Sequence, residues 1–251
     1  MPLSLRAISL REVPFMHKIV IGWMYPNLLN LHGERGSIQV LDKIGNEMGV
    51  DIEIRRIEDF NEPIQFQDYD LLVFLPGEIS TLRHLIPVLQ AQKLPEHIEN
   101  GGFVLAIGTS GLMFGNTITR EDGSVIDGLG CLDMTAKERQ YVWGDDLHVR
   151  IQGTKQELVG SQIQMADVET SMPLATVFYG MGNNNTGYDG GCYKNLIYTN
   201  CLGPLFVKNP WFAQTILKDV LLHKLGFNTT TDNTIADNSF NSTLSFIDTK
   251  K

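Results

Sequence analysis

Short apolar segments that alternate with helical segments are the feature that most constrains the fold of this chain. Residues 18–23 form an apolar run, and after a polar loop residues 34–48 carry apolar side chains at three- and four-residue steps. This spacing predicts a helix with one buried face. The residues on that face are Ile38, Leu41, Ile44 and Met48. Gly49 marks the end of the helix, and the alternating polarity of residues 50–54 predicts a strand.

The same order repeats farther along the chain. Residues 70–75 and 102–107 are apolar runs of strand length, and a helix is predicted over residues 80–92 between them. Apolar strands that alternate with helices are typical of a parallel sheet with both faces covered. The sequence therefore predicts an α/β fold with a doubly wound, mostly parallel sheet.

The pattern changes after Gly115. Shorter segments of alternating polarity, such as residues 147–151 and 175–179, predict antiparallel strands added at one edge of the sheet. A last helix is expected over residues 211–225, ending at Gly226.

Three parts are expected along the chain: an N-terminal extension over residues 1–16, one domain over residues 17–227, and a tail over residues 228–251. The tail is rich in Asn, Thr, Ser and Asp and holds only scattered apolar residues, so it is predicted to be disordered. Met1 and Met16 are both candidate start residues.

Charge and cysteine content narrow the function. The net charge of -9 argues against nucleic acid or an anionic membrane surface as the main partner, because either would repel the chain. No segment reaches the roughly 18 apolar residues of a membrane helix, so no membrane insertion is expected. The cysteines, Cys131, Cys192 and Cys201, have unrelated spacings that match neither a metal site nor an even disulfide set. We therefore expect a cytoplasmic protein without a metal or a cofactor.

The loops that follow the parallel strands are where a functional site is expected, because ligands of such sheets bind beyond the carboxyl ends of the strands. The first of these loops, residues 25–36, ends in His32-Gly-Glu-Arg-Gly36. Three further distinctive segments are Asp122-Gly-Ser-Val-Ile-Asp-Gly-Leu-Gly-Cys-Leu-Asp133, Gly180-Met-Gly-Asn-Asn184, and Tyr193-Lys-Asn-Leu196 leading to Gly203-Pro204 and Lys208-Asn-Pro210.

In this order the four segments resemble the GatD family, the glutaminase subunits of lipid II isoglutaminyl synthase. Within the class I glutamine amidotransferases that family lies in the cobyric-acid-synthase-like branch, and the resemblance spans residues 18–226. The resemblance implies a class I amidotransferase fold. It also implies the family's chemistry, in which glutamine is hydrolysed through a cysteine thioester. The ammonia then passes to a Mur-ligase-like, MurT-type partner that amidates D-glutamate in the peptidoglycan precursor.

A glycine occupies the position that the resemblance assigns to the nucleophile. Where the family has Ile-Cys-Gly-Gly after a strand, the chain has Ile107-Gly108-Thr109-Ser110. A glycine has no side chain, so no thioester can form at Gly108, and what is left for this residue is a tight turn.

Three other positions of the implied site also differ. The family's Leu-His-Gly-Pro stands here as Cys201-Leu202-Gly203-Pro204, and a leucine neither accepts nor delivers a proton. The glycine-rich oxyanion loop falls on Leu75-Pro76-Gly77-Glu78, where Pro76 has no N–H to donate. The substrate-binding arginine falls on Tyr141, with Arg139 nearby as the other candidate. We therefore predict no catalytic residue and a degenerate ligand pocket, whose candidate residues are Gly77, Gly108, Thr109, Ser110, Tyr141 and Leu202.

Two interpretations would restore a nucleophile. Residues 108–111 are superficially similar to a serine elbow, but the pattern Gly-x-Ser-x-Gly fails at Leu112, and capping or turn formation accounts better for Ser110. Cys201 lies next to the lost histidine, but a lone cysteine at a strand end is more often a small buried hydrophobe.

The first loop keeps its family pattern while the catalytic positions do not. Glu34 stands where the family carries a short acid, and Arg35 and Gly36 match. The loop, with His32, Glu34 and Arg35, either shapes the entry to the first helix, the interpretation that we favour, or faces a partner or a retained pocket.

The sequence therefore favours a catalytically degenerate amidotransferase subunit that binds a Mur-ligase-like protein or regulates amidation of the cell-wall precursor. Two alternatives stay open. One is a small-molecule binding module that reuses the empty pocket for an amino acid such as glutamine, or for a nucleotide. The other is an active glutaminase with displaced catalytic residues.

Overall fold

A six-stranded sheet lies at the centre of the structure, a computed structural model that describes residues 17–225 and 234–250. Its strands, in spatial order, are β11 (Gly191–Tyr193), β12 (Leu196–Thr199), β4 (Val104–Ile107), β3 (Leu71–Phe74), β1 (His17–Met24) and β2 (Val50–Ile57). All neighbouring pairs are parallel except β11 with β12. The predicted mostly parallel sheet with an antiparallel edge strand is confirmed.

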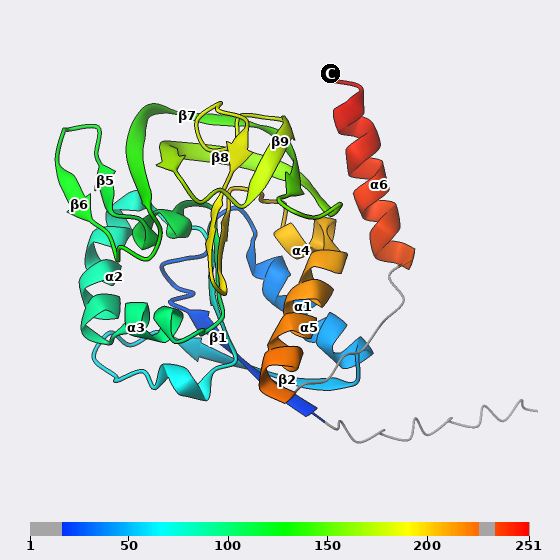
Figure 1. Ribbon diagram of the computed structural model, residues 1–251, viewed down its shortest axis with the longest axis horizontal. Coiled ribbons are helices and arrows are strands. Elements are labelled where there is room, and N and C mark those ends of the chain that lie inside the picture. The colour runs from blue at the N-terminus through cyan, green and yellow to red at the C-terminus, as the bar shows by residue number, and fades with distance from the viewer. Residues whose placement is uncertain (1–16, 226–233, 251) are drawn as a thin grey trace, which may run out of the picture.

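Helices cover both faces of this sheet (Figure 1). The helical elements are α1 (Arg35–Glu47), η1 (Phe66–Asp68), α2 (Ile79–Ala91), α3 (Leu94–Glu99), η2 (Gly108–Phe114), α4 (Leu205–Lys208), α5 (Pro210–Leu225) and α6 (Thr234–Asp248). On one face, Leu41 of α1 and Leu217 of α5 pack in one apolar cluster with Ile19 of β1. On the other face, Leu82 of α2 packs with Leu72 of β3. The two clusters are the cores of a doubly wound fold.

The remaining strands form a second six-stranded sheet, in the upper part of Figure 1. They are β5 (Thr117–Thr119), β6 (Val125–Asp127), β7 (Met134–Ile151), β8 (Glu157–Thr170), β9 (Ala175–Tyr179) and β10 (Tyr188–Asp189). Residues 147–151 and 175–179 lie in β7 and β9 of this sheet, and not at the edge of the parallel sheet as their pattern predicted. Alternating polarity specifies a strand with one buried face but not its neighbour. Here β7 pairs with β8 in a long antiparallel hairpin.

Part of the tail that composition predicts to be disordered is the helix α6. Ile247 of this helix is fully buried, and Lys250 Nζ lies 2.6 Å from Asp146 Oδ2 of β7. Composition misses α6 because a few apolar side chains suffice for a helix that packs on an existing domain. Residues 1–16, the expected N-terminal extension, lie outside the described residues, as do residues 226–233 and 251.

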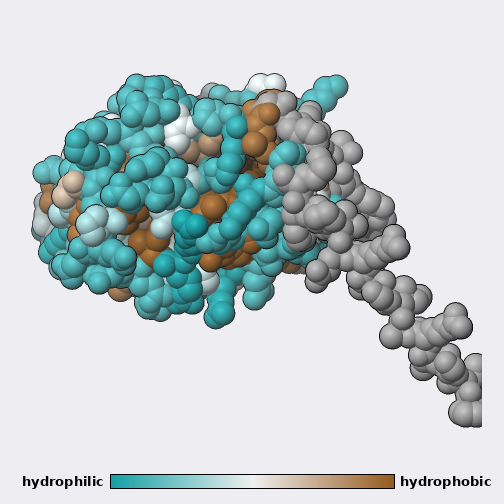
Figure 2. All heavy atoms as spheres, turned by 90° about the horizontal axis from the view of Figure 1, so that it is seen from below, coloured by the Kyte–Doolittle hydropathy of each residue, from teal (hydrophilic) through white to brown (hydrophobic). Residues whose placement is uncertain are grey.

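The surface is mainly hydrophilic on the face shown in Figure 2, where apolar side chains show between polar ones. Over residues 17–225 and 234–250, helices of the length and apolar character needed to cross a membrane are absent.

Candidate functional site

The turn at Gly108 lies at the carboxyl end of β4, between β3 and β12 in the sheet. This is the edge at which ligands of parallel sheets bind. Gly108 has φ +62° and begins the short helix η2. Residues with a side chain rarely adopt this left-handed backbone conformation, which a glycine adopts freely. The local structure is thus a tight strand-to-helix turn, as the sequence predicted.

Three positions that the resemblance assigns to the catalytic site meet at this turn. A Cβ atom built on Gly108 would lie 3.1 Å from Pro76 Cγ and 3.3 Å from Leu202 Cδ2. Pro76 is buried, and Leu202 is only 1% exposed. Apolar atoms therefore stand directly against the place from which a side chain at position 108 would project.

The loop after β3 is closed by Thr109. Gly77 N donates to Thr109 Oγ1 at 3.0 Å, and the Thr109 hydroxyl donates to Gly77 O. Thr109 is 6% exposed, so this exchange takes place away from water. Pro76 has no N–H, and the N–H of Gly77 is already bonded. The loop that the resemblance assigns to the oxyanion hole thus has its Gly77 donor engaged within the protein.

Ser110 points into the protein interior. Its side chain is fully buried, and Oγ lies 3.0 Å from both Ile107 O and Phe74 O. A hydroxyl that donates to main-chain carbonyls ties the turn to the end of β3. This geometry agrees with a turn-forming role and gives no support to a serine nucleophile, which must be exposed to substrate.

Cys201 is equally inaccessible. The residue is fully buried, and burial raises the pKa of its thiol well above the usual range, with Asp189 and Glu34 adding to the shift. Because the thiolate is the reactive form, such a cysteine is inert. The structure thus matches the interpretation of Cys201 as a small buried hydrophobe.

Glu34 is a structural clamp between the first loop and the segment around Leu202. It is fully buried, and Gly203 N donates to its Oε1 at 2.6 Å. Leu205 N and Ser37 Oγ donate to Oε2 at 2.9 and 3.0 Å. Burial raises the pKa of the Glu34 carboxyl, and these hydrogen bonds oppose the shift. The geometry of Glu34 therefore fits the interpretation that the first loop shapes the entry to the first helix.

His32 and Arg35 lie at the surface of the same loop. His32 is half-buried with φ +60°, and burial lowers the pKa of its imidazole while the charge of Glu78 opposes this. Arg35 is exposed, and its guanidinium carbon lies 5.9 Å from the centroid of the Trp23 ring. The loop reaches the site through Leu31, whose N donates to Pro76 O at 2.9 Å. These two side chains are thus close to the site without entering its buried centre.

Tyr141 is not brought into the buried part of the site. It is 75% exposed and lies in β7 where the register with β8 shifts, between Glu138 and Trp143. The neighbouring candidate, Arg139, forms an ion pair with Asp167 at 2.5 Å. Neither side chain is packed with Pro76 and Leu202.

Sequence reasoning missed a buried polar network beside Cys201. Asp189 is fully buried and accepts hydrogen bonds from Thr199 Oγ1 at 2.7 Å and Asn200 Nδ2 at 2.9 Å. Burial raises the pKa of this carboxyl, against the effect of its donors. Asn183 joins the network through Asn200 and Gly190. The signal in the sequence was the segment 180–184, whose Asn183 holds these loops together.

Among the described residues, no cluster of three or more His, Cys, Asp or Glu side chains could hold a metal ion.

Comparison with curated proteins supports the resemblance found in the motifs. The chain is 24% identical over 230 residues to the GatD subunit of the glutamine-hydrolyzing lipid II isoglutaminyl synthase of Streptococcus pneumoniae, covering 88% of this chain and 87% of the relative. It is 26% identical over 200 residues to the GatD subunit of Staphylococcus aureus, covering 77% and 81%. No protein-family model matches the chain. The chain thus resembles GatD subunits over most of its length.

Solved structures share the fold. A crystal structure of a glutamine amidotransferase covers 80% of this chain and 98% of its own length, with a TM-score of 0.55 and 13% identity. A glutamine amidotransferase from Thermotoga maritima covers 91% and 93%, with a TM-score of 0.51 and 11% identity. The fold of the chain is therefore similar to that of glutamine amidotransferases, as its motifs implied.

Proposed function

We propose that the chain is a GatD-like subunit that takes part in amidation of the peptidoglycan precursor lipid II without a glutaminase centre of its own. Similarity to two GatD subunits over 77% and 88% of the chain supports the process. Because those relatives are subunits, the similarity also supports a heteromeric partner, for which we propose a Mur-ligase-like protein of the MurT type. The chain would then act as a binding or regulatory subunit.

One observation carries the loss of catalysis. Gly108 and Leu202 stand where the resemblance places the thiol and the histidine. The Cβ position of Gly108 lies 3.1 Å from Pro76 Cγ and 3.3 Å from Leu202 Cδ2, so both groups are missing from one buried, apolar place. A thioester mechanism needs a thiolate, a base and an oxyanion donor at that point. The pairing of Thr109 with Gly77 removes one donor as well. The missing thiol and histidine, together with the engaged Gly77 donor, support the proposal of a site abandoned as a unit.

The alternative of an active glutaminase with displaced residues gains little from the geometry. Ser110 and Cys201 are both fully buried, and the Cys201 thiol has a strongly raised pKa. His32 is half-buried, and neither candidate nucleophile bonds to it among the described contacts. The proposal therefore assigns none of them a catalytic role.

A glutaminase assay tests the loss of catalysis. The purified chain, alone and mixed with the candidate ligase, is given glutamine and the released ammonia is measured. Under the proposal the signal equals that of a blank, while the Streptococcus pneumoniae GatD subunit with its own partner serves as the positive control. Glutamine turnover that stops on thiol alkylation would overturn the proposal.

A pull-down tests the partner. The tagged chain should retain a Mur-ligase-like protein from the same cell, and the complex should amidate lipid II when ammonium is supplied directly. Arg35→Ala tests whether the first loop contacts the ligase, because Arg35 is exposed at the surface of this loop. Lys43→Ala, an exposed change on α1, is its matched control. A chain that captures no ligase, even when both are co-expressed, contradicts the proposed partnership.

A further inference from the structure

The strand β2 forms a long free edge of the parallel sheet. Its neighbour on one side is β1, and over residues 17–225 and 234–250 no strand pairs with its other side. β2 has eight residues, whereas β11 at the opposite edge has three. Free edges are usually short, because the unpaired N–H and C=O groups of an edge strand can pair with another chain. The length of β2, at the lower margin of Figure 1, therefore leaves a surface for strand pairing.

Every second residue of β2 turns its main-chain groups away from the sheet. Ile57 O accepts a hydrogen bond from Tyr25 N at 2.7 Å, so the main-chain groups of Ile57 face β1. By the two-residue period of a strand, those of Ile52, Ile54 and Arg56 face outward. Their N–H and C=O groups have no hydrogen-bond partner within the described part of the chain. The free edge thus offers alternating donors and acceptors.

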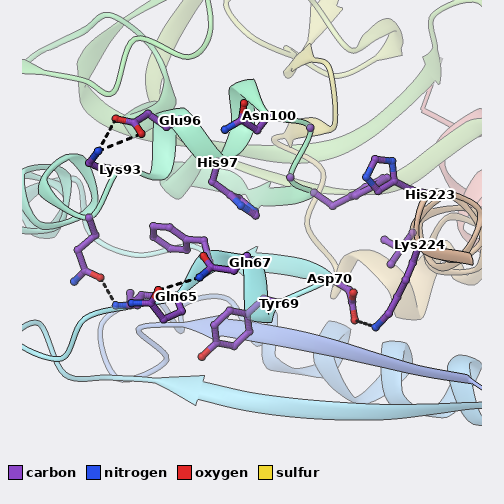
Figure 3. Close-up of a pocket in the computed structure, with 17 residues that line it drawn as sticks. Gln65, Gln67, Tyr69, Asp70, Lys93, Glu96, His97, Asn100, His223 and Lys224 are labelled. Carbon is purple, nitrogen blue, oxygen red and sulfur yellow. Dashed lines mark hydrogen bonds and ion pairs between the residues drawn. The ribbon is translucent and has the colours of Figure 1, made fainter.

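Accessible side chains of both charge signs flank this edge. Glu53 and Arg55 lie on one face of β2, with 33% and 42% of their side chains exposed, and they pair at 2.5 Å. Lys18 of β1 is a second cation at Glu53, and both cations hold the pKa of Glu53 at about 2. The Arg55 guanidinium carbon lies 5.9 Å from the centroid of the Tyr69 ring, which Figure 3 shows above the strands β1 and β2. Glu53 and Arg55 are therefore both charged at neutral pH and within reach of a partner strand.

A second copy of the chain complements this charge pattern. A two-fold axis perpendicular to the sheet sets β2 antiparallel to the same strand of the other copy. With the axis at Ile54, Glu53 of each copy lies opposite Arg55 of the other, and Ile54 lies opposite its own counterpart. Opposite charges in such cross-strand pairs attract each other, and like charges repel. The two copies would thus form two attractive pairs.

Other registers bring like charges together. An axis at Glu53 or at Arg55 sets that residue against its own counterpart. An axis at Ile52 sets Asp51 against Glu53, and an axis at Arg56 sets two arginines against each other. Between positions 52 and 56, only the axis at position 54 avoids a direct pair of like charges. The edge therefore favours one register of self-pairing.

We propose that β2 is a dimerisation edge, at which a second copy of this chain adds its own β2 antiparallel with the two-fold axis at Ile54. The pairing joins two parallel sheets into one continuous sheet. It uses the same edge on both copies, so association ends at the dimer. Three strand spacings separate β2 from β4, about 14 Å at roughly 4.8 Å each. The dimer thus leaves the Gly108 turn free and does not depend on the function proposed above.

Sedimentation equilibrium with the full chain measures the association. One strand pair is a small interface, so a monomer–dimer equilibrium that shifts with chain concentration is expected. A chain that stays monomeric over the whole accessible concentration range overturns the proposal, and so does association that continues beyond the dimer.

Amide hydrogen exchange of the unmodified chain locates the contact. The amides of Ile52, Ile54 and Arg56 should exchange more slowly as the dimer forms, because each gains a hydrogen-bond acceptor. A dimer in which these amides keep their monomer rates would place the contact elsewhere. Slower exchange only after a ligase is added would assign the edge to that protein and likewise contradict self-pairing. The measurement decides even if a variant does not fold.

Charge variants test the register. Glu53→Arg sets two cations against each other at both symmetry-related positions and should weaken the dimer by about tenfold or more. Adding Arg55→Glu to it restores unlike charges across the axis and should recover part of the lost affinity. Glu99→Arg makes the same change at an exposed ion pair of α3 and, as the matched control, should leave dimerisation unchanged. Equal dissociation constants for Glu53→Arg and the unmodified chain would exclude this register.

Discussion

Thr109 and Gly77 exchange two hydrogen bonds between the start of η2 and the loop after β3. Gly77 N donates to Thr109 Oγ1 at 3.0 Å, and the hydroxyl donates back to Gly77 O. One side chain thereby satisfies both main-chain groups of a buried glycine. It does so from the position immediately after Gly108, and the glycine belongs to the loop to which the resemblance assigns the oxyanion hole. The loop is consequently held by the protein itself and keeps its form without a ligand.

The first prediction concerns this pair. Thr109→Val keeps the shape of the side chain but leaves the buried Gly77 N–H unpaired, which lowers the free energy of unfolding by about 1 to 3 kcal/mol. Urea denaturation followed by circular dichroism measures the change. Thr109→Ser retains the hydroxyl and should lose less than Thr109→Val. Equal stability of Thr109→Val and the unmodified chain would show that the two hydrogen bonds contribute nothing.

The second prediction separates crowding from backbone strain at Gly108. Gly108→Ala and Gly123→Ala both place a side chain at positive φ, +62° and +84°, which destabilises by about 1 to 2 kcal/mol. At Gly108 the new Cβ also meets Pro76 at 3.1 Å, whereas at Gly123 nothing lies within 4 Å. Gly108→Ala should therefore lower the unfolding free energy by about 1 kcal/mol more than Gly123→Ala, because overpacking adds to the backbone strain. Identical losses for the two variants would mean that Pro76 and Leu202 move aside freely.

The third prediction is a pH dependence that arises from Glu34. Burial raises the pKa of this carboxyl in the folded state, so the folded chain holds its proton to higher pH than the unfolded chain. Between the ordinary pKa of a carboxyl and the raised pKa of Glu34, unfolding therefore releases a proton, and the stability of the fold decreases as pH rises through this range. The stabilising contribution is fully present below the ordinary carboxyl pKa and is lost above the raised one.

Glu34→Gln removes this titration and provides the comparison. The unfolding free energy of the unmodified chain minus that of Glu34→Gln should decrease as pH rises from the ordinary carboxyl pKa through the raised one. Asp189, which also has a raised pKa, is present in both chains and cancels in the difference. Denaturation curves at several pH values measure it. A difference that grows with pH would show that the hydrogen bonds from Gly203 and Leu205 outweigh burial.

The fourth prediction concerns the attachment of α6. Ile247 is fully buried, whereas its neighbour Phe246 is 58% exposed. Ile247→Ala removes a packed side chain, a change that typically costs about 2 to 5 kcal/mol, and should release α6 from the domain. Hydrogen exchange of the α6 amides should accelerate in Ile247→Ala and stay near the original rate in Phe246→Ala. Equal protection in both variants would contradict the packing of α6 through Ile247.

Local patterns were sufficient for the parallel sheet and its helices. The helix expected over residues 34–48 is α1 (Arg35–Glu47), because its apolar spacing depends only on neighbouring residues. The strand at residues 175–179 was also expected, but its place in the second sheet was not. Pairing of β9 with β7 depends on residues far away along the chain, which periodicity does not record.

The sequence by itself determined which chemical groups are absent from the turn. Gly108 has no side chain, Leu202 transfers no proton and Pro76 has no N–H, and these are properties of covalent structure that no fold alters. Only the tertiary structure decided that Thr109 bonds Gly77 across 32 positions of the chain and that Glu34 holds Gly203 across 169. Such contacts depend on where folding brings distant main-chain groups and how far it removes them from water, and neither quantity is encoded in the local pattern of residues.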